Sequence, residues 1–229
     1  MSEDLQSLTR ATPTIESDHP DVIGFARRHS QGAQDEIEAA VRLYYAVRDG
    51  FRYDPYGAVI TVEGLRASTT LEAGRGWCVA KSVLLAACYR TLGIPARLGF
   101  ADVRNHLSTA NMRSAMSTDV FFWHGYTSVH LEGRWVKATP AFNIELCEKF
   151  GFLPLEFDGR SDSLYHPFDR EGNKHMEYVT DRGEYADAPI DAMIATFREE
   201  YANMMAKGEL KFSRSDFEAE VEAEVTENG

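Results

Sequence analysis

Cys78 has the sequence context of a reactive cysteine. It follows a segment in which Gly74 and Gly76 permit a tight turn, and it begins a strongly apolar stretch. This pattern predicts a helix over residues 78–92, with Gly93 just past its end. A thiol in the first turn of a helix lies at the positive end of the helix dipole, beside N–H groups that favour the thiolate and can stabilise an oxyanion. We therefore expect Cys78 to be a nucleophile.

A cysteine nucleophile needs a base to accept its proton, and His124 is the best candidate among the seven histidines. It lies inside the predicted strand 120–131, where a side chain is held in place and partly buried. The other histidines lie in polar or loop-like sequence, at a strand edge or near a turn: His19, His29, His106, His130, His166 and His175.

The partner of the His124 ring depends on a predicted hairpin around Glu132-Gly133. A two-residue turn there puts His124 opposite Ala141. The diagonal neighbours on the same face are then Thr139 and Asn143, at roughly 7–8 Å between backbones. The amide oxygen of Asn143 can accept the imidazole N–H, whereas Thr139 offers a hydroxyl on a shorter arm. Both residues remain candidates for orienting the base.

Other residues near these positions have structural and functional interpretations. Trp77, beside the nucleophile, either lines the acyl site and its oxyanion region or packs in the core, and Tyr126 is a second candidate hydrogen-bonder on the face of His124. Lys81 is interpreted as a solvated surface lysine, and Cys88 and Cys147 as structural. The cysteines and histidines lack zinc-ligand spacing, and no phosphate-binding loop is present, so we expect no metal and no cofactor.

Four blocks occur in an order that resembles the transglutaminase-like superfamily, over about residues 50–143. They are Gly76-Trp-Cys-Val-Ala-Lys81, Leu92-Gly-Ile-Pro-Ala-Arg97, His124-Gly-Tyr-Thr-Ser-Val-His-Leu-Glu-Gly-Arg-Trp135 and Thr139-Pro140. The resemblance implies a papain-like arrangement with Cys78 as nucleophile and His124 as general base. Thr139 stands where the family has its orienting Asp, so either Asn143 takes over that role or the activity is weak or absent.

The remaining periodicity favours an α+β fold in which a central buried helix carries the cysteine and packs on an antiparallel β-sheet. Helices and strands come in separate runs, and not as alternating βαβ units. Helices are expected at 35–49, 78–92 and 190–205, and strands at 96–103, 120–131 and 134–139. The lead-in 1–33 is interpreted as irregular or partly strand-like, and 145–188 shows few clear periods.

One domain is expected over 1–229, because no linker divides the chain. Its core covers about 35–145, and the extension 146–229 packs on that core. The acidic tail 215–229 is either frayed or a short helix that the Ser215/Glu218 capping box begins.

The net charge of −12, without a basic run, argues against a nucleic-acid or anionic-membrane partner. Three cysteines without a CxxC pair argue against a disulfide scaffold. The acidic start is unlike a signal peptide, and no apolar run is long enough to span a bilayer. We expect a cytoplasmic protein, whose oligomeric state the sequence leaves open.

The predicted function is cysteine-dependent acyl chemistry on amide or peptide bonds through a thioester, by a hydrolase or acyltransferase of the peptidase or amidase kind. Hydrolysis is favoured over cross-linking. The alternative is a catalytically silent domain that uses the same cleft for binding or assembly, and Thr139 is its main support.

Overall fold

The computed structural model describes residues 4–105, 109, 112, 114, 116, 118–164, 176–201, 217, 219 and 220. A short 3-10 helix at Ser7–Thr9 opens the chain. The α-helices are α1 (Pro20–Ser30), α2 (Glu36–Gly50), α3 (Val62–Leu65), α4 (Ala67–Ala73), α5 (Cys78–Thr91), α7 (Ile144–Phe150) and α8 (Ile190–Glu200).

The strands form two sheets. The larger is a four-stranded antiparallel sheet with the order β5-β4-β3-β6, built from β3 (Ala96–Asn105), β4 (Val120–Leu131), β5 (Arg134–Ala138) and β6 (Met176–Tyr185). The smaller sheet pairs β1 (Arg52–Tyr53) with β2 (Arg75–Gly76) in parallel. This short pair joins the end of α2 to the turn that precedes α5.

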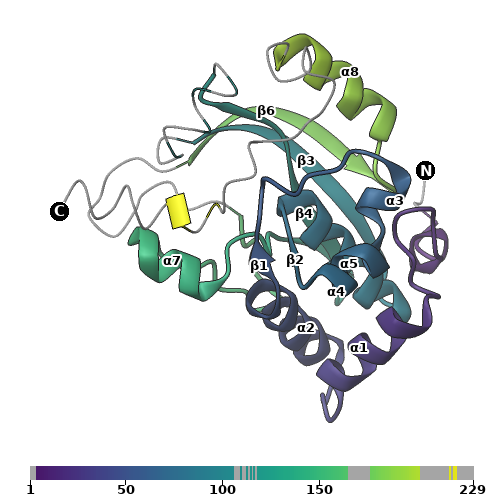
Figure 1. The fold of residues 1–229 in the computed structure, drawn as a ribbon. Coiled ribbons are helices and arrows are strands. Elements are labelled where there is room, and N and C mark those ends of the chain that lie inside the picture. Colours follow the sequence, from purple (N-terminus) through teal and green to yellow (C-terminus); the bar gives the residue numbers. More distant parts are fainter. Residues whose placement is uncertain are drawn as a thin grey trace.

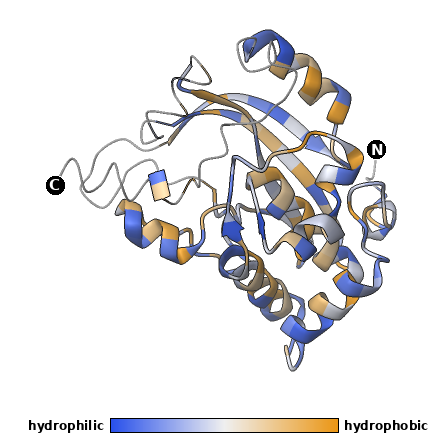
Figure 2. Ribbon diagram, viewed as in Figure 1, coloured by the Kyte–Doolittle hydropathy of each residue, from blue (hydrophilic) through white to orange (hydrophobic). Residues whose placement is uncertain are grey.

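The helix α5 is the centre of the fold, as its apolar sequence predicts. All of its residues from Cys78 to Arg90 are buried, and Figure 1 shows α1, α2 and α4 around it below the larger sheet, with α8 above β6. The apolar colouring of α5 and of the inward side of α2 in Figure 2 follows this arrangement. The structure confirms the α+β class, with the cysteine at the start of the buried helix.

The predicted hairpin is confirmed in type and register. Strands β4 and β5 pair Thr127 with Ala138, and the turn residues Glu132 and Gly133 both have positive φ, 48° and 80°. This is the backbone twist that favours two-residue hairpins. The ladder ends at Ala138, however, so Ala141 is not paired across the hairpin with His124, whose strand partner is Ala101 of β3.

The sequence-based interpretation of the lead-in 1–33 was wrong, and the stretch 145–188 contains two elements that it did not predict. The lead-in contains α1, which begins with Pro20 at its first position and His19 as its N-cap, and which buries Val22, Phe25 and Ala26. Proline at the first position is a local helix-start signal, and the helix packs on α2 and α5. The stretch 145–188 contains α7 and β6, and β6 lies at the edge of the sheet with mostly exposed or half-buried residues, so it carries no strong alternation.

The C-terminal part reaches the core. The amphipathic helix predicted from Ile190 is α8, and it buries Met193 and Phe197. Phe217 packs against Tyr53, with ring centroids 5.7 Å apart. Ser215 and Glu218, the predicted capping box, lie outside the described residues.

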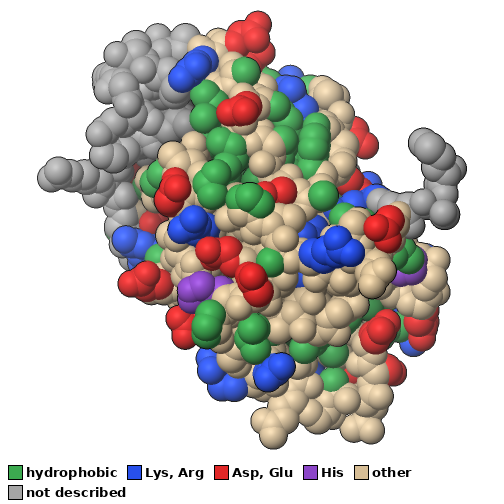
Figure 3. Space-filling view, turned by 90° about the vertical axis from the view of Figure 1, so that its right-hand side faces the viewer, with side chains coloured by type: hydrophobic (Ala, Val, Ile, Leu, Met, Phe, Trp, Pro, Cys, Tyr) green, Lys and Arg blue, Asp and Glu red, His purple; other side chains and the backbone are tan. Residues whose placement is uncertain are grey.

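The surface mixes both signs of charge. On the face in Figure 3, acidic and basic side chains are interspersed, and apolar side chains gather in the upper half. None of the helices in the described part of the chain has the length and apolar character needed to cross a bilayer. Cys78, Cys88 and Cys147 are all free and buried.

Candidate active site

Cys78 is placed by the turn between α4 and α5. Gly74 ends α4 in the left-handed conformation (φ 64°), and Gly76 then pairs with Tyr53. A Cβ on Gly76 would lie 3.1 Å from the Cβ of Ala80 and 3.2 Å from Thr70, so any larger residue would crowd this crossing. Trp77 is the N-cap of α5 and provides no side-chain cap, which leaves the N–H groups of the first turn open.

Two opposing effects act on the Cys78 thiol. The backbone N–H groups of Gly125, Val79 and Cys78 itself are directed at the sulfur and lower its pKa, as the helix start predicts. Burial is the larger effect, because the residue is only 5% exposed, and it raises the pKa from 9.0 to about 11. The resting group is therefore a neutral thiol, contrary to the thiolate that its helix position alone favours.

Strand β4 approaches the first turn of α5 at Gly125. A Cβ on Gly125 would lie 3.0 Å from the Cα of Val79, so only glycine permits this contact. The contact brings the Gly125 N–H to the sulfur and sets His124, the preceding residue, beside the start of α5. His124 is 5% exposed.

Cys78 and His124 line one cavity of about 60 Å³. Its wall comes from β1, the start of β4, α8 and the residue before Cys78. Much of this wall is aromatic, contributed by Tyr53, Trp77, Phe121, Phe122, Phe197 and Tyr201. Tyr201 joins two of these elements, because its hydroxyl donates to the Val120 carbonyl and accepts from the Phe122 N–H, both at 3.0 Å.

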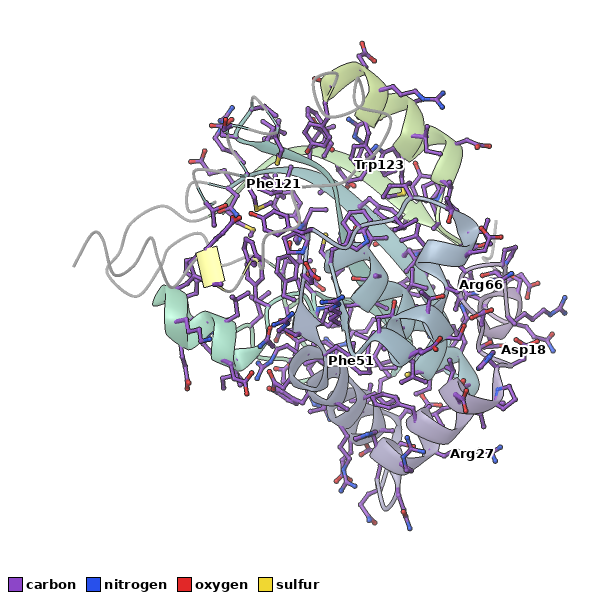
Figure 4. The ribbon with its side chains drawn as sticks, in the orientation of Figure 1. Asp18, Arg27, Phe51, Arg66, Phe121 and Trp123 are labelled. Carbon is purple, nitrogen blue, oxygen red and sulfur yellow. The ribbon has the colours of Figure 1, made fainter. Side chains whose placement is uncertain are left out.

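A buried ion pair that the sequence did not reveal holds the strand next to His124. Asp102, 2% exposed, accepts the Trp123 N–H at 3.1 Å and pairs with Arg182 of β6 at 2.8 Å. Trp123 has a φ of 60°, and the β3–β4 register shifts between Ala101 and Val103. Trp123 and Phe121, labelled in Figure 4, lie at the upper part of the sheet. The pair thus fixes a bulge directly before the candidate base.

The two predicted partners of His124 have other hydrogen-bonding arrangements. Asn143 is buried, and its amide oxygen accepts the Tyr53 N–H at 3.0 Å. The Thr139 hydroxyl makes no hydrogen bond within the described residues, while its carbonyl accepts from Tyr44 at 3.1 Å. An orienting role for either residue stays a prediction.

Of the neighbouring candidates, Trp77 lines the cavity and Tyr126 does not. The Tyr126 hydroxyl donates to Glu184 at 3.3 Å, and its ring covers Gly99, where a Cβ would lie 2.0 Å from that ring. The Tyr126 side chain therefore points toward Glu184 of β6 and not into the cavity.

The interpretation of Lys81 as a surface residue was wrong. Lys81 is fully buried, and its ammonium group donates to the carbonyls of Arg48 (2.8 Å), Phe51 (2.6 Å) and Ala141 (2.7 Å). Sequence pattern could not show this, since the three acceptors come from two distant segments of the chain.

Within the described residues, no group of three or more histidines, cysteines and carboxylates is arranged to hold a metal ion. The chemistry available to the cavity is that of a thiol, an imidazole and backbone N–H groups.

A helix-borne cysteine, a strand-borne histidine and an antiparallel sheet define a fold of the papain-like class. The family model of the transglutaminase-like superfamily matches residues 23–140, and the chain belongs to that superfamily. No curated protein matches the sequence.

Solved structures with related folds include a "Putative Cysteine Protease" from Cytophaga hutchinsonii, with a TM-score of 0.53 and 14% identity, covering 84% of this chain. The chain spans about half (50%) of that protein's length. An arylamine N-acetyltransferase from Mycobacterium abscessus matches with a TM-score of 0.40 and 15% identity, over 58% of this chain and 46% of that one.

Proposed function

We propose that the chain cleaves amide or peptide bonds with Cys78 as nucleophile, His124 as general base and water as final acceptor. The observation that carries this proposal is that Cys78 and His124 line the same cavity, with the Gly125 N–H directed at the sulfur. Membership of the transglutaminase-like superfamily, through a match over residues 23–140 that includes both side chains, supports it.

In the first step, the Cys78 sulfur attacks the carbonyl carbon while its proton passes to His124. Because the thiol is neutral at rest, deprotonation accompanies the attack and does not precede it. The N–H groups that face the sulfur are suited to the developing oxyanion. His124 then gives its proton to the leaving amine as the C–N bond breaks, and a thioester remains. Water attacks the thioester, His124 accepts a proton from it, and the sulfur leaves as a thiol once that proton returns.

We favour water over a second amine because of the cavity wall. Among the described residues that line it, none is Asp or Glu. A cationic lysine acceptor would lose its hydration there without gaining a counter-charge. We place the protein in the cytoplasm, since its three cysteines are all free.

The test is hydrolysis of a panel of N-acetyl amino acid p-nitroanilides by the native protein and three variants. Cys78→Ser and His124→Ala should each lower kcat/KM at least 100-fold. Cys88→Ala, at a buried cysteine outside the cavity wall, is the matched control and should retain most of the activity. Equal activity in Cys78→Ser and the native protein would refute the proposal.

Two observations favour a second candidate, a catalytically silent binding domain. Burial raises the pKa of the Cys78 thiol to about 11, which lowers the fraction of reactive thiolate. The Asn143 amide oxygen already accepts a hydrogen bond from the Tyr53 N–H. This alternative predicts no acyl-enzyme by intact mass spectrometry and no preference of iodoacetamide for Cys78 over Cys147 in the native fold.

A further inference from the structure

The described residues that line the cavity beside Cys78 are mostly apolar or aromatic. Apart from Cys78, its described non-aromatic members are apolar: Pro55, Ala58, Ile60, Met112 and Met116. In the described part of the chain, no Lys, Arg, Asp or Glu lines it.

The tyrosines of the wall stay neutral. Burial raises the pKa of Tyr53 well above its usual value, and it raises the pKa of Tyr201 as well. An ammonium group that entered the cavity would give up its hydration without a carboxylate partner among the described lining residues. An apolar group would be stabilised by leaving water.

The size of the cavity limits what it can hold. An apolar protein cavity of about 150 Å³ holds a benzene molecule, and this one measures about 60 Å³. A short aliphatic group fits such a volume better than an aromatic ring. The two methionines can adjust to its shape, because their side chains are unbranched and flexible.

We propose that this cavity receives the acyl side of the substrate and selects a short, uncharged aliphatic acyl group over one of the same shape that carries a positive charge. The inference rests on the proposed function, since it assumes that Cys78 is acylated. Each buried methylene should favour acylation by about fourfold.

The experiment uses two p-nitrophenyl esters, of butanoic acid and of β-alanine. The two acyl groups have nearly the same shape, and they differ in a terminal methyl group against an ammonium group. Acylation of Cys78 is followed by p-nitrophenol release and by intact mass, and each rate is divided by the rate of the same ester with glutathione. The butanoyl ester should react at least 50-fold faster by this measure. A ratio near one, with Cys78 acylated by both esters, would overturn the inference and leave the proposed function standing.

Two variants test whether the wall sets this preference. Ala58 is half-buried and lines the cavity, so Ala58→Asp should lower the butanoyl preference at least tenfold by attracting the ammonium group. Val59, its neighbour, is 48% exposed and does not line the cavity, so Val59→Asp should keep the ratio within twofold of native. An equal fall in both variants would assign the effect to net charge and refute the wall's role. If neither ester acylates Cys78 in the native protein, the proposed function fails, and the inference fails with it.

Discussion

At the scale of single residues, Cys78 shows that a helix N-terminus does not by itself determine the ionisation of a thiol. Three N–H groups face the sulfur and lower its pKa, yet burial raises that pKa to about 11. The loss of hydration is larger because the side chain is almost entirely enclosed by apolar and aromatic neighbours. A catalytic role for Cys78 therefore depends on a base that acts during the attack.

This balance predicts the pH dependence of Cys78 alkylation. Iodoacetamide reacts with the thiolate, whose fraction grows tenfold per pH unit below the pKa. With the pKa of Cys78 at about 11, the rate should rise about tenfold per unit from pH 7 to pH 10, without a plateau. Intact mass spectrometry at each pH measures it, and Cys78→Ser gives the background from the other two thiols. A plateau below pH 8 would contradict this prediction and show a preformed thiolate–imidazolium pair.

At the scale of elements, the start of β4 is held through a side chain of the adjacent strand β3, which in turn pairs with a side chain of β6. Asp102 of β3 accepts the Trp123 N–H, and Arg182 of β6 pairs with the same carboxylate. The positive φ of Trp123 is costly for a bulky residue, so it persists only where surrounding contacts determine it. We infer that Asp102 is a positioning residue that acts on His124 through the bulge.

The prediction for this element concerns Asp102→Asn. The amide can still accept the Trp123 N–H, but it leaves the Arg182 charge without its partner, so the free energy of unfolding should fall by roughly 1–3 kcal/mol. Urea unfolding followed by tryptophan fluorescence measures it. The control is Asp119→Asn, which removes an ion pair with Arg104 at 3.0 Å. This pair is on the surface, because the Asp119 side chain is 50% exposed and the Arg104 side chain 41% exposed. That loss should be under about 1 kcal/mol. Equal losses would mean that the Asp102 pair has no special role.

The elements also show how far sequence reasoning reaches. The helix α5 and the β4–β5 hairpin could be predicted because their signals are local: an apolar run after a glycine turn, and alternation around Glu132-Gly133. The helix α1 does have local signals, Pro20 at its first position and an amphipathic pattern, and the sequence-based interpretation missed them. The edge strand β6 has no such signal, because its residues are mostly exposed or half-buried and do not alternate. The cysteine and histidine were placed on the correct elements, whereas Asp102 carries no local signal as a partner of Arg182.

At the scale of the whole molecule, the buried Lys81 of α5 makes hydrogen bonds to two distant segments of the chain, residues 48–51 and residue 141. It lies on α5, and its ammonium group donates to carbonyls at the end of α2, just before β1 and in the segment that leads to α7. These three carbonyls lie at the end of a helix or in loops, where no helix or strand hydrogen bond satisfies them. Lys81 therefore provides donors to carbonyls that would otherwise be buried without one. The segment with Ala141 leads to Asn143, which bonds Tyr53 in the cavity wall.

Burial lowers the pKa of Lys81 to about 7, which makes its contribution to stability depend on pH. In the unfolded chain the side chain keeps its usual pKa near 10.5. Between these two values the unfolded state binds more protons than the folded state, so the free energy of unfolding rises with pH. The contribution is complete above the unfolded pKa and is lost as the pH falls through 7.

We therefore predict that Lys81→Met is less stable than the native protein at pH 7, and that the gap widens from pH 7 to pH 10. The methionine has a similar length but removes the N–H donors of Lys81, three in the ammonium form and two in the neutral amine. The carbonyls that these donors satisfied lose their hydrogen bonds. The substitution also removes the titrating amino group of Lys81. The difference in unfolding free energy between the native protein and Lys81→Met should therefore grow by up to about 1.4 kcal/mol per pH unit. Urea unfolding of both proteins at each pH measures this difference, in which other titrating groups cancel.

Lys137→Met, at a side chain 32% exposed, controls for the lost charge. A gap that stays constant from pH 7 to pH 10 would mean that the three carbonyls keep Lys81 charged throughout.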